Sequence, residues 1–296
     1  MAAAKQKIIF DTDIGDDIDD AWALATCIRH PELELVGVTT VWRDTELRAA
    51  QARFLLELAG TPRVPVAAGA RDALDKINAI ARNRQADVLS AEDEERLRKG
   101  RTDGVRFLAE MAREHEGLTL IPVGPETNIA RFIMEFPEQF SLIGRLVIMG
   151  GHRMANRDTA EYNAGADPRA TKVVFGCRKP ITMVGLDVTL QCRMRPSELE
   201  QIRAKDTPLS RAILRMTELW QEAHRRGEAE EPRMPVVHDP LAVLVAADPS
   251  LVECEAQRIE IDEQGRCVRK PGQPNVAVAV DVDEDRVRRK LVELIG

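Results

Sequence analysis

Three features are scarce in this 296-residue sequence: long apolar runs, paired cysteines and aromatic side chains. No apolar run approaches the roughly 20 residues of a membrane-spanning helix, and the opening MAAAKQK lacks the apolar core of a secretion signal. The five cysteines are scattered and have no CxxC spacing, which disfavours a disulfide framework. Aromatic residues make up only 4% of the chain, so few can stack on a ligand. We therefore expect a cytoplasmic protein with reduced thiols and no membrane partner.

Charge and composition narrow the class further. The chain has 49 acidic residues against 42 Lys and Arg, a net charge of −7 and an isoelectric point near 5.5. An acidic balance argues against a nucleic acid as the main partner. The apolar fraction of 44% and the charged fraction of 31% are typical of a soluble globular protein. Because no low-complexity linker or internal repeat divides the chain, we expect one domain over residues 1–296.

Short β-branched runs alternate with amphipathic helical stretches along most of the chain. The runs are almost continuously apolar, as in parallel strands that are covered on both faces. The pattern predicts strands at 7–11, 34–41, 64–68, 118–124, 146–151 and 181–188, and helices at 19–30, 45–59, 103–115, 126–136 and 167–176. We therefore expect an α/β fold with a mostly parallel, Rossmann-like sheet flanked by helices.

The pattern changes after residue 188. Helices are predicted at 197–204, 208–226 and 239–247, followed by a small β-hairpin (252–261 and 275–281) and a closing helix at 283–294. The charged stretch 71–101 has weak periodicity and is predicted to be a mobile flap over a site. The expected fold thus has a C-terminal helical part and a hairpin added to the sheet.

Unusual polar residues follow the predicted strands. Ligands of open α/β sheets bind outside the carboxyl ends of the strands, and polar segments begin there at 11–20, 42–44, 123–128 and 149–163, and at Asp187. This placement predicts one composite site at one edge of the sheet.

The first of these segments holds six aspartates within ten residues: Asp11, Asp13, Asp16, Asp17, Asp19 and Asp20. Carboxylates at this density repel each other unless a cation neutralises them or protons are retained. With no His or Cys in the run, oxygen ligands favour Ca²⁺ or Mg²⁺ over zinc. Acids in a first helical turn can also be caps, which suits Asp16 or Asp17 but not Asp11 and Asp13 at the end of a buried strand.

Two other kinds of acidic site fit less well. An EF-hand loop would need a Glu at its twelfth position and a helix before it, and both are missing. A strand followed by Asp-x-Asp resembles Mg²⁺-dependent phosphatases of the haloacid-dehalogenase type. Those enzymes need Thr or Ser and Lys at later strand ends, where this chain has VGPETN and MGGH. The phosphatase stays a distant alternative.

Nine segments taken in order make the pattern more specific. Together they resemble the inosine–uridine nucleoside hydrolases, which are calcium-dependent N-ribohydrolases, from Lys7 to the last helix. The segments are DTDIGDDIDDAWAL (11–24), GVTTV (37–41), VPVAAGA (64–70), VGPETNIA (123–130), VIMGG (147–151), AEYNAGADPRA (160–170), TMVGLDVT (182–189), HDPLAV (238–243) and VAVAVDVDEDRV (276–287).

The resemblance implies a Ca²⁺ site and a reaction. The implied ligands are Asp13, Asp20, the carbonyl of Val123, and Asp239. Asp13 would accept a proton from a Ca²⁺-bound water as general base, and Asp19 would contact a ribose hydroxyl. The reaction would hydrolyse the N-glycosidic bond of a ribonucleoside to ribose and free base through an oxocarbenium-like transition state. The loop is two residues longer than the common form of the motif, so Asp16 and Asp17 have no assigned role.

The resemblance also implies a clamp for the sugar. Asn156 and Glu161 match positions that bind the 5′-hydroxyl, and Asn163 matches one that binds the ring hydroxyls. Met149 would lie under the sugar, although a Met in LVIMGG is more often plain core and only the family pattern favours the sugar contact.

His238 matches the residue that faces the leaving base and donates a proton to it. An ordinary histidine pKa near ~6.5 suits that role, while a cap or structural hydrogen bond is the alternative. His224, together with Trp220, lies on a helix that we expect to overhang the base and is the reserve candidate.

Three departures from the family pattern bear on the substrate. Trp42-Arg43-Asp44 replaces the usual Gly-Asn after TTV, so that Asp44 stands in for a substrate-binding Asn. RNRQADVLS (82–90) replaces the HGxDGLG segment that contributes to the base pocket, and aromatic residues are few. The main expectation is a ribonucleoside hydrolase, and the alternative is a hydrolase or binder of another ribosyl compound. Family resemblance implies a homodimer or homotetramer.

Overall fold

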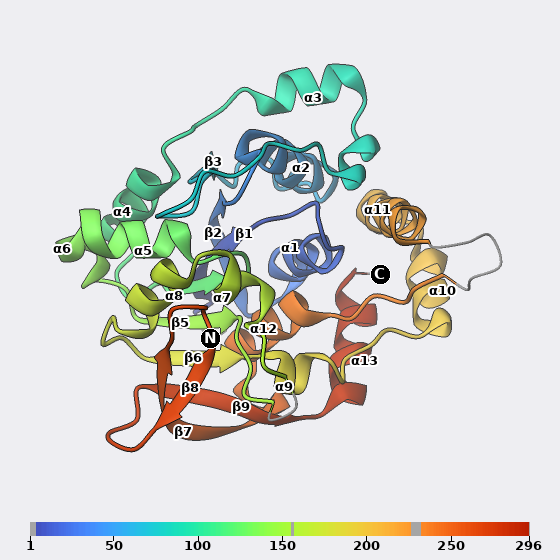
Figure 1. Ribbon diagram of the computed structural model, residues 1–296. Coiled ribbons are helices and arrows are strands. Elements are labelled where there is room, and N and C mark those ends of the chain that lie inside the picture. Colours follow the sequence, from blue (N-terminus) through green and yellow to red (C-terminus); the bar gives the residue numbers. More distant parts are fainter. Residues whose placement is uncertain (1–3, 155–156, 226–231, 296) are drawn as a thin grey trace.

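The computed structural model describes residues 4–154, 157–225 and 232–295. Within these ranges nine strands form one sheet in the order β3-β2-β1-β4-β5-β6-β9-β7-β8 (Figure 1). The strands are β1 (Gln6–Thr12), β2 (Leu33–Thr40), β3 (Val66–Ala68), β4 (Thr119–Pro122), β5 (Arg145–Met149), β6 (Ile181–Val184), β7 (Val252–Ile261), β8 (Cys267–Lys270) and β9 (Val276–Val282). The first six strands and β9 are parallel, which confirms the predicted fold class.

Helices cover both faces of the sheet. They are α1 (Asp19–Arg29), α2 (Thr45–Leu58), α3 (Ala91–Arg98), α4 (Gly104–Glu114), α5 (Thr127–Glu135), α6 (Pro137–Phe140), α7 (Tyr162–Ala166), α8 (Pro168–Phe175), α9 (Leu186–Thr189), α10 (Pro196–Lys205), α11 (Pro208–His224), α12 (His238–Ala247) and α13 (Glu284–Ile295). Two short 3₁₀ helices, η1 (Arg84–Val88) and η2 (Pro249–Leu251), are the other elements of the described ranges. No helix of the described ranges is long and apolar enough to cross a membrane.

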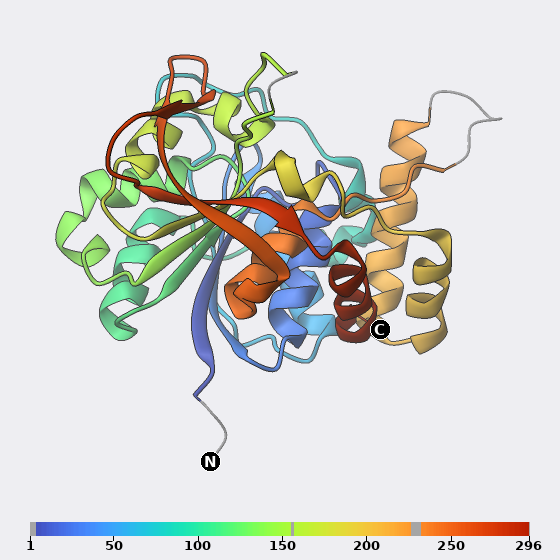
Figure 2. The same cartoon turned by 90° about the horizontal axis from the view of Figure 1, so that it is seen from below.

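Two apolar clusters form the core, one on each face of the sheet. Alternate residues of a strand point to opposite faces, so Ile8 and Phe10 pack with α1, α2, α11 and α12, whereas Ile9 packs with α4 and α5. Figure 2 shows the same two layers, with the blue and orange helices on one side of the sheet and the green helices on the other.

The C-terminal strands differ from the prediction. Residues 252–261 form β7 as expected, but β7 turns back through β8, a short strand that the sequence did not predict. The strand predicted at 275–281 is β9, which extends the main sheet by pairing parallel with β6 and antiparallel with β7. The predicted hairpin is therefore part of the central sheet, because β9 carries apolar residues that the sheet buries.

The charged stretch 71–101 contains η1 and α3, and several contacts hold it to the rest of the fold. Arg96 pairs with Glu57 of α2 at 2.6 Å, and Asn83 and Gln51 exchange two side-chain hydrogen bonds of 3.1 and 3.0 Å. Gln85 donates to the carbonyl of Asp17 at 2.6 Å. Residues 71–101 therefore pack against the loop between β1 and α1, residues 13–18, which we call the aspartate loop. The predicted mobility of residues 71–101 stays a prediction.

The order of strands reverses at β1, whose neighbours are β2 on one side and β4 on the other. Helices depart to opposite faces at such a point, and the crevice between them is where open α/β sheets bind ligands. Asp13 follows β1 and Val123 follows β4, so both lie at this crevice.

Candidate active site

A cavity of about 610 Å³ opens at the carboxyl ends of the parallel strands. Most residues singled out from the sequence line it: Asp13, Asp19, Asp20, Val123, Met149, Glu161, Asn163, His224, His238 and Asp239. Asp16, Asp17, Arg43 and Tyr162 lie at the same cavity. Asn156 lies outside the described residues. The fold thus brings together segments that are up to about 220 residues apart in sequence.

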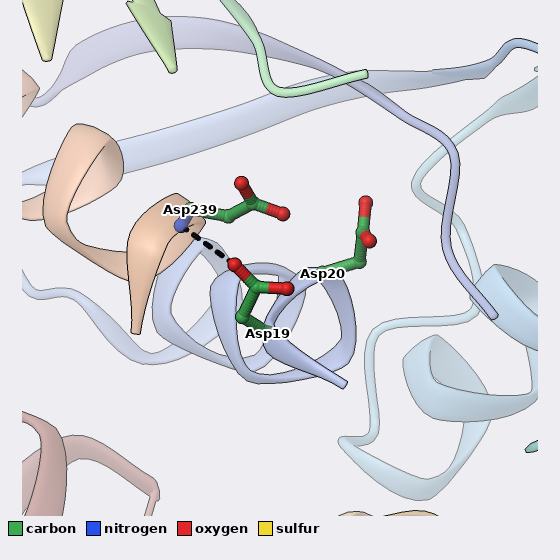
Figure 3. A group of neighbouring side chains, drawn as sticks. All are labelled: Asp19, Asp20 and Asp239. Atoms are coloured by element: carbon green, nitrogen blue, oxygen red, sulfur yellow. Dashed lines mark hydrogen bonds between the residues drawn. The ribbon is translucent and has the colours of Figure 1, made fainter. Parts of the chain in front are cut away.

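Three buried carboxylates meet on one side of the cavity. Asp19, Asp20 and Asp239 each offer one oxygen, and these oxygens lie within 4.8 Å of one another (Figure 3). Asp19 and Asp20 occupy the first turn of α1, and Asp239 occupies the first turn of α12. The Asp239 backbone N–H donates to Asp19 Oδ2 at 3.1 Å, and the Thr12 hydroxyl donates to Asp20. The two helix starts therefore aim their acids at one point.

The electrostatics of these three residues favour either a bound cation or retained protons. Burial raises the pKa of each carboxyl well above its usual range, and repulsion from neighbouring aspartates raises it further. Within the described ranges no Lys or Arg forms an ion pair with any of the three. Buried charges are normally paired or bound to a metal. An all-oxygen donor set fits a hard divalent ion such as Ca²⁺ or Mg²⁺.

Asp13 borders the three-aspartate cluster from the loop after β1. Its carboxyl is buried, and burial raises its pKa to about 7, against the lowering effect of the nearby Arg48 guanidinium. Gly124 makes this close packing possible, because a Cβ there would come within 2.8 Å of Asp13 Oδ1. The adjacent Val123 carbonyl accepts a hydrogen bond from Asn163 Nδ2 at 2.6 Å and has a second lone pair for another partner.

The residues of the predicted sugar clamp form the opposite wall. Glu161 caps α7 and accepts hydrogen bonds from the backbone N–H groups of Gly151, Asn163 and Ala164 at 2.8–3.1 Å. These bonds hold the carboxylate rigidly against the cavity. Met149 ends β5, and its sulfur lies 3.8 Å from Asn163 Nδ2.

His238 begins α12 beside Asp239. Its Nδ1 lies 2.7 Å from the Thr189 hydroxyl oxygen, and the ring lines the cavity. Burial lowers the pKa of His238 to about 4, with Asp17 raising it and Arg193 and Arg157 lowering it. The pKa of His238 therefore lies below the ordinary histidine value, and the imidazole of the ligand-free protein is neutral at pH 7.

His224 and Trp220 lie in the last turns of α11. His224 lines the cavity, with Nδ1 2.8 Å from the Trp220 carbonyl oxygen. Trp220 does not line the cavity: its ring is buried in the core beside the His224 ring, 5.2 Å away between centroids. A ligand in the cavity can therefore contact His224 but not Trp220.

Asp44 was expected to contact the substrate, but its carboxylate is engaged elsewhere in the fold. Its carboxylate caps α2 by accepting from the Leu47 N–H at 3.0 Å, and it accepts two hydrogen bonds from Arg98 at 3.1 and 2.9 Å. It is not among the residues that line the cavity. Because α3 brings Arg98 to it, Asp44 joins α2 to α3.

Sequence reasoning missed several contributors. Thr189 orients His238, and Asp11 ties the end of β1 to β2 and to the first turn of α5 by accepting from Thr39 (2.5 Å) and Asn128 (2.7 Å). Arg48, a single arginine in the apolar run LRAAQA, is buried behind the aspartate loop. A charged residue inside a buried helix face was the available signal for Arg48, whereas the Thr189 contact had none.

Comparisons with known proteins agree with this geometry. The sequence profile of a family described as "Inosine-uridine preferring nucleoside hydrolase" matches residues 8–289. The chain is 30% identical to the pyrimidine-specific ribonucleoside hydrolase RihA of Enterobacter sp. (strain 638), over 98% of this chain and 96% of that protein. It is 30% identical to the inosine-uridine preferring nucleoside hydrolase of Leishmania major, over 95% and 94%. The solved purine-preferring ribonucleoside hydrolase of Gardnerella vaginalis superposes with a TM-score of 0.83 at 27% identity, over 98% of both chains.

Proposed function

The chain belongs to the inosine-uridine preferring nucleoside hydrolase family and hydrolyses the N-glycosidic bond of a ribonucleoside, and we propose that it does so with a Ca²⁺ ion held at the floor of the cavity. The proposed ligands are Asp13, Asp20, Asp239 and the carbonyl of Val123. A bound Ca²⁺ would neutralise these carboxylates, hold the ribose diol and lower the pKa of a water molecule.

One observation carries the proposal. Asp19, Asp20 and Asp239 converge while buried, and the described part of the chain supplies no basic ion-pair partner for them. A structural cluster of this kind would be strongly destabilising without a cation or retained protons. Calcium fits better than zinc because all the donors are oxygens.

The ribose is proposed to lie between this cluster and the opposite wall. Asp19 accepts a hydrogen bond from one ribose hydroxyl and Asn163 binds another, while Glu161, together with Asn156, binds the 5′-hydroxyl. Met149 packs under the ring. As the glycosidic bond breaks, positive charge develops on the sugar ring. The surrounding carboxylates are already in place and stabilise that charge electrostatically.

Two residues move protons in the proposed mechanism. Asp13 accepts a proton from the attacking water, a role that suits a carboxylate beside the cluster and at the cavity wall. His238 donates to the leaving base. If the Thr189 hydroxyl donates to Nδ1, the imidazole proton lies on Nε2, which is the ring nitrogen left for the base. Negative charge building on the base raises the affinity of the imidazole for a proton. His238 therefore takes up a proton from solvent as the glycosidic bond breaks, passes the Nε2 proton to the base and returns to the neutral imidazole.

The base preference differs among the relatives, which include pyrimidine-specific and purine-preferring enzymes. In this chain Tyr162 is the only Phe, Trp or Tyr among the described residues that line the cavity. Large planar bases therefore have little aromatic surface on which to stack. We propose a preference for small bases over purines. Another ribosyl compound is the alternative substrate, because Arg43 lies where the family usually has Gly-Asn and residues 82–90 replace the HGxDGLG segment.

A nucleoside panel tests the proposal. The purified protein is incubated with uridine, cytidine, inosine, adenosine and guanosine, with and without a calcium chelator, and reducing-sugar release is measured. We expect release from at least one nucleoside, abolition by chelator and recovery on adding Ca²⁺. If no nucleoside releases sugar, the proposal that the protein hydrolyses common ribonucleosides is contradicted. Sugar release that the chelator does not affect would contradict the proposed role of Ca²⁺. Phosphate release from p-nitrophenyl phosphate with Mg²⁺ would instead support a phosphatase.

We also propose, from the family resemblance, that the protein is a homodimer or homotetramer, acts in the cytoplasm and serves nucleoside salvage. Sedimentation velocity of the purified chain measures the first point directly, and a monomer at micromolar concentration would contradict it.

A further inference from the structure

Arg48 has one of the most buried charged side chains of the molecule, at 2% exposure, and it lies directly behind the aspartate loop. It comes from the first turn of α2, which follows β2. Its guanidinium donates from Nε to the carbonyl of Trp42 at 2.8 Å and from Nη1 to the carbonyl of Ile14 at 2.8 Å. Nη1 also donates to the carbonyl of Asp13, and Nη2 donates to Asp16 Oδ2 at 2.9 Å.

These partners lie in the two segments that follow β1 and β2 at the cavity. Three are backbone carbonyls, and without Arg48 the carbonyls of Asp13 and Ile14 would lose a charge-assisted hydrogen bond in the protein interior. The planar fork of arginine suits such convergent acceptors, whereas a lysine ammonium does not reproduce its geometry. The guanidinium therefore fastens the backbone that carries the Asp13 side chain.

Asp16 is the only carboxylate that pairs with Arg48 among the described residues. It also accepts from Arg43 Nη1 at 3.2 Å, and its side chain is 30% exposed. Arg43 is held in the left-handed region, at φ 61°, by a hydrogen bond from its N–H to the carbonyl of Arg71 at 2.8 Å. Asp16 thus bridges Arg43 of the β2–α2 connection and Arg48 of α2.

We propose that Arg48 is a positioning residue for the metal site: it holds residues 13–16 in the shape that presents Asp13 to the ion, with Asp16 as its counter-ion and not a metal ligand. The inference rests on the proposed function, because it assumes that Asp13 faces a bound divalent cation. Arg48 itself does not line the cavity, so it acts through the loop and not by touching the substrate.

A simpler role for Arg48 predicts the opposite result. If the guanidinium were only a positive charge near the acidic cluster, its removal would make Ca²⁺ bind more tightly, because like charges repel. If it positions Asp13, its removal loosens the loop and Ca²⁺ binds more weakly. The sign of the change in Ca²⁺ affinity therefore separates the two roles.

The experiment is a calorimetric titration of chelator-stripped protein with CaCl₂ for the wild type and for Arg48→Met, Arg48→Lys and Arg53→Met. Arg53 is the matched control, because it is a partly buried arginine of the same helix that donates to the Leu97 and Val66 carbonyls at 2.6 and 2.8 Å, away from the loop. We expect the Kd for Ca²⁺ to rise by about 10- to 100-fold in both Arg48 variants, the range known for groups that orient metal ligands. In Arg53→Met it should change by less than about 2-fold.

Three outcomes would overturn the inference. They are an unchanged or tighter Ca²⁺ Kd in Arg48→Met, a wild-type Kd in Arg48→Lys, and an Arg53→Met effect as large as that of Arg48→Met. A wild type that binds no Ca²⁺ would instead contradict the proposed function, and the inference with it, so the two failures are distinguishable.

Asp16→Asn provides a test that does not depend on the folding of the Arg48 variants, since Asp16 is partly exposed. Hydrogen–deuterium exchange of the metal-free protein should be about 5-fold faster in residues 13–18 of Asp16→Asn than in the wild type, because the counter-ion of Arg48 is lost. Unchanged exchange there would overturn the role given to Asp16. A loss of Ca²⁺ affinity in Asp16→Asn as complete as in Asp239→Asn would identify Asp16 as a ligand and would also overturn it.

Discussion

The carboxylates of Asp19, Asp20 and Asp239, which form the floor of the cavity, differ from the carboxylates between α2 and α3 in what neutralises their charge. Asp44 and Glu94 share the Arg98 guanidinium, and hydrogen bonds from arginine outweigh burial and lower the pKa of both carboxyls. Asp19, Asp20 and Asp239 are fully buried and have no such partner among the described residues, so the pKa of each is raised. Paired acids near α3 join elements of the fold, whereas the unpaired acids of the floor are those that could hold a metal ion.

This contrast separates stability from function. Removing an acid from the α2–α3 region breaks an ion pair and should affect folding slightly. Removing an acid from the floor relieves repulsion and should affect catalysis strongly, with little loss of stability in the metal-free protein. The predictions below test that difference from its largest expected effect to its smallest.

Asp13→Asn should reduce ribose release by about 10³-fold or more, because a general base and a metal contact are lost together. The unfolding temperature of the metal-free protein should stay the same or rise, since one buried carboxylate is removed. Reducing-sugar release and thermal unfolding in chelator measure the two effects. Retained activity would remove Asp13 from the mechanism.

His238→Ala should reduce kcat by about 10²-fold, most for nucleosides whose bases leave poorly, because proton donation to the base is lost. His224→Ala is the matched control, since its ring lines the same cavity while Nδ1 is engaged with the Trp220 carbonyl. Steady-state kinetics on two nucleosides with different leaving groups measure both. A larger loss in His224→Ala than in His238→Ala would transfer the acid role to His224.

Glu126 is a third kind of buried carboxylate, outside the three-aspartate cluster. Burial raises its pKa to about 8, Oε2 accepts from the Thr171 hydroxyl at 2.7 Å, and Oε1 has no partner in the described structure. The raised folded pKa favours the protonated native state, so this contribution to stability is full below about pH 4.5 and is lost as the pH rises toward about 8.

Glu126→Gln imitates the protonated form, so the wild type should lose stability relative to Glu126→Gln between pH 5 and 8. The expected change is about 1.4 kcal/mol for each unit by which the pKa is raised. Urea unfolding of both proteins across this range provides the comparison, and other carboxyls cancel in the difference. A difference that does not vary with pH would mean that Glu126 is ionised in the native state.

Asp44→Asn should have the smallest effect. Breaking its pair with Arg98 should lower the free energy of unfolding by about 0–1 kcal/mol, as for partly exposed ion pairs, and should leave KM within about 2-fold of the wild type. Arg98→Met should give a somewhat larger loss, since it breaks the pair with Asp44 and also the pair with Glu94. A large rise in KM for Asp44→Asn alone would restore Asp44 to the substrate site.

Local pattern and family resemblance predicted most of the fold. The apolar runs of β1, β2 and β4 are distinctive because parallel strands are buried on both faces, and their carboxyl ends indicated the edge where the cavity lies. The short, half-exposed β8 has no such pattern and was missed. The strand predicted at 181–188 ends at Val184, because Leu186–Thr189 turns into α9.

The site was predictable where a residue type carries its chemistry by itself. The aspartate run of the first loop indicated a metal from its charge density, whereas the roles of His238 and Asp239 came only from the family resemblance and stay predictions. Arg48, Thr189 and Glu126 depend on contacts between distant segments, which no local pattern encodes. Asp44 was misplaced for the same reason, because its position after TTV is shared with an Asn while its partner Arg98 lies 54 residues further along the chain.

The most direct test of the account is whether the unpaired acids of the floor bind a cation and the paired acids do not. Chelator-stripped wild type, Asp239→Asn and Asp44→Asn are titrated with CaCl₂ by calorimetry. We predict one Ca²⁺ per chain for the wild type and for Asp44→Asn, and a Kd at least about 100-fold weaker for Asp239→Asn. Wild-type protein that binds no Ca²⁺, or Asp239→Asn that binds it as tightly as the wild type, would contradict the account.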